Sequence, residues 1–316
     1  MKKTSKKKVL FIAIIMVLSL LGGSYYLGKL VYDGSVGSSE VNKSENIVEV
    51  FSQKPDKPLD KLKNYKHENL MIKTKNNYKI ESLLIKSNKK TNNTIVMVHG
   101  IGRSYYDMLR YSFNYLDNGY NVLVYNQRHT GKSGGDDYSF GLYERYDLDS
   151  AVKYIKKIYP DGKIGVHGFS MGAATSTMHV ALNEKDKNVD FYILDSPYSK
   201  MEDAVRLGIE AENIPLIPTS YISFWGDIYT KLHSGFNFDD VMPYKAVENS
   251  TVPIMLIHEK GDKVCASDNS EEIYKSIPHN KKELWIIDGN NHIGGYDDTG
   301  NEYFFRIFKF IDKYAK

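Results

Sequence analysis

The sequence predicts an α/β fold, in which a mostly parallel central sheet has helices on both faces, preceded by a transmembrane helix. Three observations lead to this prediction. Short apolar segments alternate with helical segments from Thr94 to the C-terminus, a G-x-S-x-G motif lies between such a strand and such a helix, and an apolar run follows an N-terminal lysine cluster. The chain has 316 residues, 41% hydrophobic and 26% charged, which is ordinary for a globular protein.

The alternating segments define the expected sheet and its covering helices. Apolar strands separated by helices imply parallel pairing with both faces buried. We expect strands at Thr94–Val98, Asn121–Tyr125, Lys163–His167, Val189–Leu194, Val252–His258 and Glu283–Ile287. We expect helices at Ser104–Asn118, Leu142–Ile158, Ser170–Leu182, Ser267–Ser276 and Glu302–Ala315. A hairpin precedes them within Glu68 to Ser87, with its polar turn at Lys75-Asn76-Asn77.

The N-terminal segment has the pattern of a membrane-targeting signal. Five lysines precede an uncharged run from Val9 to Gly28, which is long enough to cross about 30 Å of hydrocarbon as a helix. The lysines place the N-terminus in the cytoplasm. We therefore predict a cytoplasmic basic tail at 1–8, a signal anchor at 9–28, a linker at 29–66 and an extracytoplasmic domain at 67–316. The alternative is a signal peptide whose cleavage releases a secreted protein.

Composition excludes several classes of function. The net charge of +3 owes part of its value to the N-terminal lysines and gives no basis for a nucleic-acid partner. The single cysteine, Cys265, excludes an intramolecular disulfide and a cysteine-cluster metal site, and it is expected to be a packed small residue. Neither HExxH nor paired CxxC spacing is present, so we expect no metal and no cofactor.

A nucleophile elbow is predicted at the motif Gly168-Phe169-Ser170-Met171-Gly172. Ser170 would occupy a strained turn that exposes its hydroxyl, and the flanking glycines would avoid clashes where the backbone crowds. The alternative is an ordinary Gly-Ser turn between a strand and a helix.

An earlier loop would supply the other half of such a site. Strand Thr94–Val98 runs into His99-Gly100-Ile101-Gly102. A serine nucleophile acting on a carbonyl forms an oxyanion, which two backbone N–H groups must stabilise. We expect these donors to be Ile101 and Met171. The alternative for the loop is a plain glycine turn, and His99 is expected to be packed and hydrogen-bonded rather than a base.

Three segments carry a resemblance to a known family. They are V-H-G-I-G at 98–102, N-Q-R-H-T-G-K-S-G-G at 126–135 and H-G-F-S-M-G-A at 167–173. Together they resemble the α/β-hydrolase fold family, and most closely its bacterial membrane-anchored or surface serine hydrolases of the esterase/lipase-like group. The resemblance extends from about Leu70 to the C-terminus. It implies the chain order nucleophile, acid, histidine.

The resemblance assigns the remaining members of a catalytic triad. Asp262, in the loop after strand Val252–His258, matches the family's acid. His292, in Asp288-Gly289-Asn290-Asn291-His292, matches its base. His292 would take the Ser170 proton and deliver it to the leaving group, while Asp262 would orient the imidazole.

Other residues compete for these roles, and two positions depart from the family pattern. Asp195 also follows a strand and is an alternative acid. His129, His233 and His258 are other histidines, but none ends the penultimate strand-to-helix connection. The family commonly has His-Gly at His258-Glu259 and Val-Pro at Val264-Cys265, so the shape of this loop is expected to differ.

A cap is expected at about 200–250, between two strands. This insertion is far longer than an ordinary connection and contains many apolar and aromatic residues. The resemblance implies a helical lid over the active site, which would favour an apolar acyl or alcohol group. Alternatively, these residues simply pack the lid onto the core.

These expectations converge on a serine hydrolase that cleaves a small carboxylic ester with an apolar group, held at a membrane by its N-terminal helix. A peptidase or an acyltransferase of the same fold would use the same acyl-enzyme. The alternative that is not an enzyme is a surface binding module on a dead scaffold, although such a module need not keep Ser170, Asp262 and His292 together.

Overall fold

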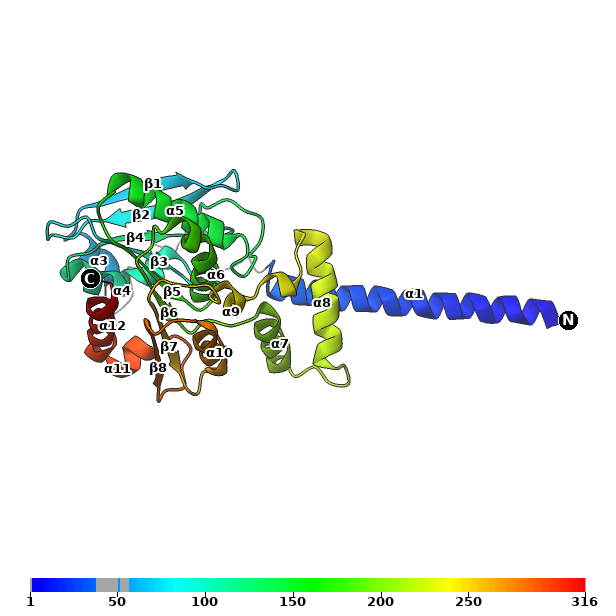
Figure 1. Ribbon diagram of the computed structural model, residues 1–316. Helices are drawn as coiled ribbons and strands as arrows, with labels where there is room; N and C mark the ends of the chain where they lie inside the picture. Colours follow the sequence, from blue (N-terminus) through cyan, green and yellow to red (C-terminus); the bar gives the residue numbers. More distant parts are fainter. Residues whose placement is uncertain (1, 38–50, 52–56, 316) are drawn as a thin grey trace.

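The computed structural model describes residues 2–37, 51 and 57–315, and within these residues the chain forms one eight-stranded sheet (Figure 1). The strand order is β1-β2-β4-β3-β5-β6-β7-β8. Strand β2 pairs antiparallel with β1 and β4, and all the other pairs are parallel. The strands are β1 His67–Lys73, β2 Lys79–Ile85, β3 Thr94–Val98, β4 Asn121–Tyr125, β5 Ile164–Phe169, β6 Phe191–Asp195, β7 Ile254–Glu259 and β8 Lys282–Ile287.

The composition of the central strands explains their burial. Strands β3, β4 and β6 each have four residues from Val, Ile, Leu, Met, Phe and Tyr and one polar end residue, and every residue in them is buried. Such runs suit a parallel sheet that is covered on both faces. The predicted parallel strands and the N-terminal hairpin are confirmed, and β3 and β4 have the predicted bounds.

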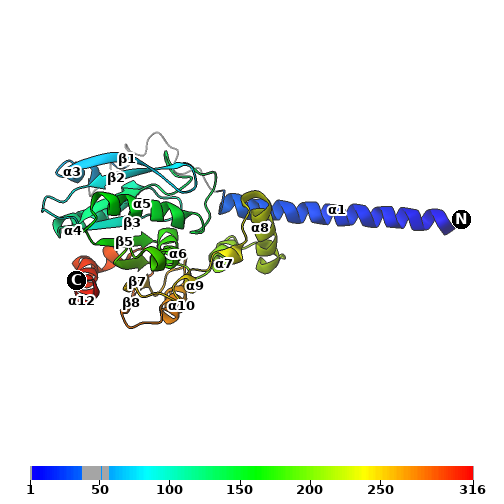
Figure 2. The same ribbon diagram turned by 45° about the horizontal axis from the view of Figure 1, so that its top comes forward.

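Two layers of helices cover the sheet (Figure 2). Along β3, Ile95 and Met97 pack toward one layer, whereas Val96 and Val98 pack toward the other, because successive side chains of a strand point to opposite faces. The first layer contains α4 Tyr105–Asp117 and α12 Asn301–Tyr314, and the second contains α5 Glu144–Ile158, α6 Met171–Asp186 and α10 Asp268–Ser276. These are the predicted helices, with ends shifted by a few residues.

The N-terminal helix α1 runs from Lys2 to Gly34 and projects away from the domain (Figure 1). Its segment Lys6–Gly34, of 29 residues, is long and apolar enough to cross a membrane. The helix continues past Gly28, where the predicted span ends. The predicted linker 29–66 therefore differs from the structure at both ends, since it includes the end of α1 and the short helix α3, Pro58–Leu62. Residues 38–50 and 52–56 of that linker lie outside the described residues.

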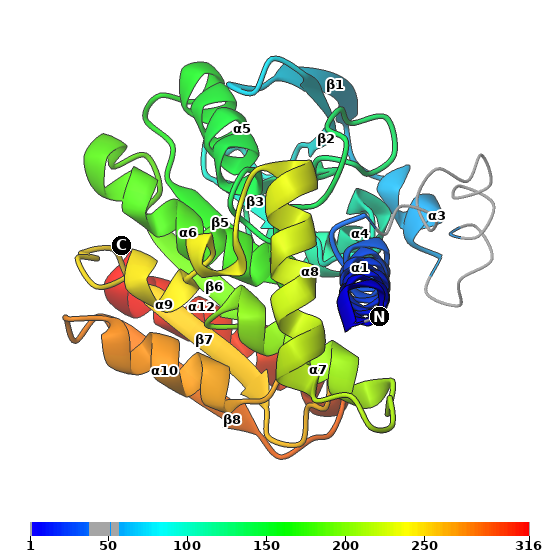
Figure 3. The ribbon, with the colours of Figure 1, turned by 90° about the vertical axis from the view of Figure 1, so that its right-hand side faces the viewer.

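The segment between β6 and β7 forms a helical cap, as predicted. Figure 3 shows α8 lying across the face of the domain from which α1 projects. The cap contains α7 Met201–Ala211, α8 Thr219–Ser234, the short 3-10 helix Phe238–Asp240 and α9 Pro243–Ala246. Beneath it, an apolar cluster joins Ile222 of α8 and Met201 of α7 to Met171, the first residue of α6.

Helix α12 offers a matched test of this core. Phe310 is fully buried against the sheet, whereas Phe305 of the same helix is 67% exposed. Phe310→Ala should lower the free energy of unfolding by about 3–5 kcal/mol, because it removes an aromatic ring and leaves a cavity. Phe305→Ala should change it by no more than about 0.5 kcal/mol. Urea titrations of the detergent-solubilised protein measure both, and equal losses would contradict the placement of α12.

Candidate active site

The turn between β5 and α6 places Ser170 in a strained backbone conformation. Its φ is 53° and its ψ is −121°, a region that residues other than glycine rarely occupy. Hydrogen bonds hold the turn on both sides. The Ser170 N–H donates to the Asp195 carbonyl at 2.8 Å, and the Ala174 N–H donates to the Ser170 carbonyl at 3.0 Å. This strand–turn–helix geometry is that of the predicted elbow.

Close backbone packing explains the two glycines of the motif. A Cβ atom at Gly168 would lie 2.4 Å from the Gly172 carbonyl oxygen. A Cβ atom at Gly172 would lie 2.1 Å from the Val98 carbonyl oxygen. Both distances are far below van der Waals contact, so a side chain at Gly168 would push α6 away from β5 and one at Gly172 would push it away from β3. The glycines therefore allow the start of α6 to lie against the ends of β5 and β3.

The structure brings Ser170, His292 and Asp262 into one hydrogen-bonded chain. The His292 Nε2 atom lies 2.7 Å from the Ser170 Oγ atom, and its Nδ1 atom lies 2.6 Å from the Asp262 Oδ2 atom. Asp262 follows β7 and His292 follows β8, so the three residues come from separate strand ends. The arrangement assigns the proton of a neutral His292 to Nδ1, which leaves Nε2 to accept from the serine hydroxyl.

Several donors surround the Asp262 carboxylate. Burial opposes its ionisation, but hydrogen bonds from His258, His292 and the Cys265 N–H outweigh burial and hold the pKa of Asp262 well below its usual value. The Val264 and Cys265 N–H groups donate to Oδ1 at 2.8 and 3.0 Å. Asp262 is therefore ionised at neutral pH and able to stabilise an imidazolium.

Two residues that our sequence reasoning did not assign to the site support it from behind. His258 is fully buried, and its Nε2 lies 3.4 Å from the Asp262 Oδ2 atom. Glu259 is also buried, and it accepts a hydrogen bond from the Asn291 N–H, next to His292. The sequence did contain a signal for the role of Glu259, since this residue stands where the family commonly has glycine. A buried carboxylate at that position needs hydrogen-bond donors, which the neighbouring loop can supply. The loop that carries His292 folds around this carboxylate.

The residues expected to be oxyanion donors belong to two backbone segments near Ser170. Met171 is the first residue of α6, where a backbone N–H has no acceptor within the helix. The 99–102 loop passes close to Ser170, since a Cβ atom at Gly100 would lie 3.2 Å from the Ser170 Cβ. Ile101, next in this loop, packs against the cluster that contains Met171. The two backbone segments that the sequence analysis chose thus flank Ser170.

The competing residues have other surroundings. Asp195 accepts hydrogen bonds from Tyr303 and Ser196 in the core, where burial raises its pKa. His99 is fully buried, its Nε2 accepts from the Gln127 N–H at 3.0 Å, and burial lowers its pKa to about 4, which confirms it as a packed histidine. His233 contacts Tyr25 of α1.

His129 packs its ring edge-on against Tyr138. Cys265 is buried, as predicted, and burial raises the pKa of its thiol. Within the described residues, no group of three His, Cys, Asp or Glu side chains could hold a metal ion.

Comparisons with known proteins agree with this architecture. A family model described as the alpha/beta hydrolase fold matches residues 93–215. The Bacillus subtilis (strain 168) protein YqkD is 32% identical over 227 residues, which cover 70% of this chain and 72% of YqkD. The esterase Pf2001 of Pyrococcus furiosus has a similar structure, with a TM-score of 0.66 and 25% identity, over 81% of this chain and 96% of the esterase.

A third similarity is more distant. The acylaminoacyl peptidase of Pyrococcus horikoshii has a TM-score of 0.57 and 18% identity, over 80% of this chain and 42% of the peptidase. The chain therefore belongs to the α/β-hydrolase fold family. Its esterase neighbour supports a hydrolase, and the peptidase shares the fold.

The strain at Ser170 leads to a stability prediction. Ser170→Gly should relax the positive φ, whereas Ser170→Ala removes the same hydroxyl but keeps the strain. Strain relief of about 1–3 kcal/mol exceeds the roughly 0.4–1 kcal/mol that glycine adds to the entropy of the unfolded chain. Ser170→Gly should therefore melt at a higher temperature than Ser170→Ala in thermal scans. A lower melting temperature for the glycine variant would contradict the strain.

Proposed function

We propose that this protein is a membrane-anchored serine hydrolase that cleaves a carboxylic ester through an acyl-enzyme on Ser170. The chain of hydrogen bonds from Ser170 through His292 to Asp262 carries the proposal, with donor–acceptor distances of 2.7 and 2.6 Å. A general base within this distance can take the hydroxyl proton as the oxygen attacks.

The chemistry follows from the geometry. The His292 Nε2 atom takes the Ser170 proton while Oγ bonds to the ester carbonyl carbon, and the carbonyl oxygen becomes an oxyanion. The Ile101 and Met171 N–H groups stabilise that oxyanion. The imidazolium, held by ionised Asp262, then protonates the leaving alkoxide as the C–O bond breaks. Water then attacks the acyl carbon while His292 takes its proton. The bond from the acyl carbon to Oγ breaks, His292 returns the proton to Oγ, and the carboxylic acid leaves.

The cap supports an apolar substrate group. The cluster beneath it contains Met171, and Ile101 packs against it, so apolar side chains approach the nucleophile from the cap side. An acyl chain or an apolar alcohol would gain about 25 cal/mol for each Å² of apolar surface buried there.

Helix α1 supports attachment to a membrane. Its apolar segment is long enough to cross a bilayer, and the lysines that precede this segment favour a cytoplasmic N-terminus and an extracytoplasmic catalytic domain. The rival is a signal peptide that is cleaved before the protein acts.

The ester assignment is tested by hydrolysis of chromogenic acyl esters of increasing chain length. The detergent-solubilised protein should show an optimum at a chain longer than acetyl, because the cap cluster is apolar. Ser170→Ala should lower kcat by at least about 10⁴-fold and Asp262→Asn by about 10²–10⁴-fold, since the asparagine would favour the wrong imidazole tautomer.

Phe305→Ala, a change on the exposed side of α12, serves as the control with unchanged kcat. An unchanged rate of ester hydrolysis by Ser170→Ala would contradict the serine mechanism. Hydrolysis of acyl-peptides in place of esters would favour the peptidase, and transfer to an added alcohol faster than to water would favour the acyltransferase.

A further inference from the structure

The anchor helix is packed against the cap, along a face that begins at Ser24. The Ser24 hydroxyl hydrogen-bonds the Tyr221 hydroxyl of α8 at 2.5 Å. A Cβ atom at Gly28 would lie 2.3 Å from the Trp225 carbonyl oxygen, so the two backbones touch at this point. Beyond Gly28, Val31 packs against Gly226 of α8. Since these α1 positions recur at helical spacing, they form one docking face.

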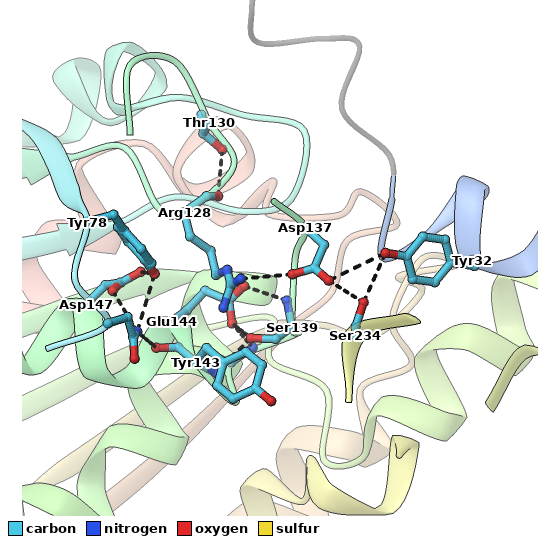
Figure 4. Close-up of polar contacts among 12 residues, drawn as sticks. Tyr32, Tyr78, Arg128, Thr130, Asp137, Ser139, Tyr143, Glu144, Asp147 and Ser234 are labelled. Atoms are coloured by element: carbon cyan, nitrogen blue, oxygen red, sulfur yellow. Dashed lines mark hydrogen bonds and ion pairs between the residues drawn. The ribbon is translucent and has the colours of Figure 1, made fainter. Parts of the chain in front are cut away.

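A half-buried polar joint fixes the C-terminal ends of both helices to the catalytic domain (Figure 4). The Tyr32 hydroxyl lies 3.0 Å from the Ser234 hydroxyl at the end of α8, and both donate to Asp137. The other carboxylate oxygen of Asp137 forms an ion pair with Arg128 at 2.9 Å. The Tyr138 N–H also donates to the Val36 carbonyl at 2.9 Å. The anchor and the cap helix are therefore one assembly.

The length of α1 sets where this assembly meets a bilayer. The apolar part before the first docked residue, Val9 to Gly23, is about 22 Å long at 1.5 Å per residue. It is about 8 Å shorter than the hydrocarbon core of about 30 Å. Completing the span requires Ser24 to Gly28, which lie against Tyr221 and Trp225. A bilayer that contains the whole apolar run therefore brings α8 to the acyl–headgroup boundary, the depth of interfacial helices.

The outward side of α8 suits this position. Three of its large side chains lie on one stripe at helical spacing and are exposed, namely Tyr221 at 38%, Phe224 at 57% and Leu232 at 68%. In the turn before α8, Leu216 is fully exposed at 102%. Exposed apolar side chains gathered on one side of a helix are typical of a contact with a partner or a membrane. Its continuity with the apolar run of α1 identifies the bilayer as that contact.

We infer that α8 lies in the membrane interface and that the substrate is a membrane-resident acyl ester, which enters the site from the bilayer beneath the cap. This inference rests on the proposed ester hydrolase. On its inner side, Ile222 of α8 belongs to the cluster that contains Met171, next to Ser170. One helix thus contacts lipid with its outer stripe and the apolar lining of the site with its inner side. The inference places the path of the acyl chain between these two sides of α8.

Tryptophan fluorescence tests the position of α8 without relying on catalysis. The chain has 2 tryptophans, Trp225 in α8 and Trp285 in β8. Full-length Trp285→Phe and Trp225→Phe proteins, each with one tryptophan, are reconstituted in phosphatidylcholine vesicles containing lipids brominated near the top of their acyl chains. We expect about a twofold or greater loss of Trp225 fluorescence at the interfacial depth. Trp285 fluorescence should be unchanged, and an unquenched Trp225 would overturn the inference.

Hydrolysis tests the entry route. The measured quantity is the rate on a long-chain fluorogenic ester dissolved in the vesicles, divided by the rate on water-soluble acetyl ester. Replacing Phe224 and Leu232 by Asp should lower this ratio roughly tenfold, because the charges oppose burial of α8 in the interface. Phe305→Asp, an equally exposed change on α12, should leave it unchanged. An unchanged ratio in the α8 variant would overturn entry from the bilayer. If the wild-type protein hydrolysed neither ester, that result would instead contradict the proposed ester hydrolase.

Discussion

The close approach of α6 to β3 and β5 is the constraint on which the rest of the site depends. The Gly168 and Gly172 positions leave no room for a side chain, and this packing holds Ser170 at a φ of 53°. The same contact brings the start of α6, with Met171, and the 99–102 loop close to the serine. The hydroxyl therefore extends from the carboxyl end of the sheet, toward the loops after β7 and β8. Packing energy stabilises a strained turn that exposes a reactive group.

Parallel topology then supplies the partners of the serine. Because β5, β7 and β8 run in one direction, Ser170, Asp262 and His292 meet at the same edge of the sheet although they are far apart in sequence. Buried groups behind them keep this arrangement, with His258 against Asp262 and Glu259 inside the loop of His292. Above the edge, the cap and α1 are joined through Tyr32, Ser234 and Asp137, so the end of α1 is part of the folded domain.

The sequence predicts local elements well because their signals are local. Strands such as Thr94–Val98 and Asn121–Tyr125 are apolar runs bounded by polar loops, and the structure gives the same bounds. The nucleophile elbow can also be predicted, because its two glycines are required by close backbone packing. The docking of α1 on α8 is not visible, because Ser24 and Tyr221 are 197 residues apart and neither is unusual alone. Nor does the pattern show that α1 continues past Gly28, where residues suited to a linker are held as helix by tertiary contacts.

The most direct measurement of the central claim is labelling by a fluorophosphonate, which reacts with a serine only when a base activates it. The account predicts a single labelled peptide containing Ser170, found by mass spectrometry of the full-length protein. Labelling should be absent in Ser170→Ala and slowed by roughly 10³-fold or more in His292→Ala, which removes the base. Equal labelling of the His292→Ala protein, or none in the folded wild type, would contradict an activated serine.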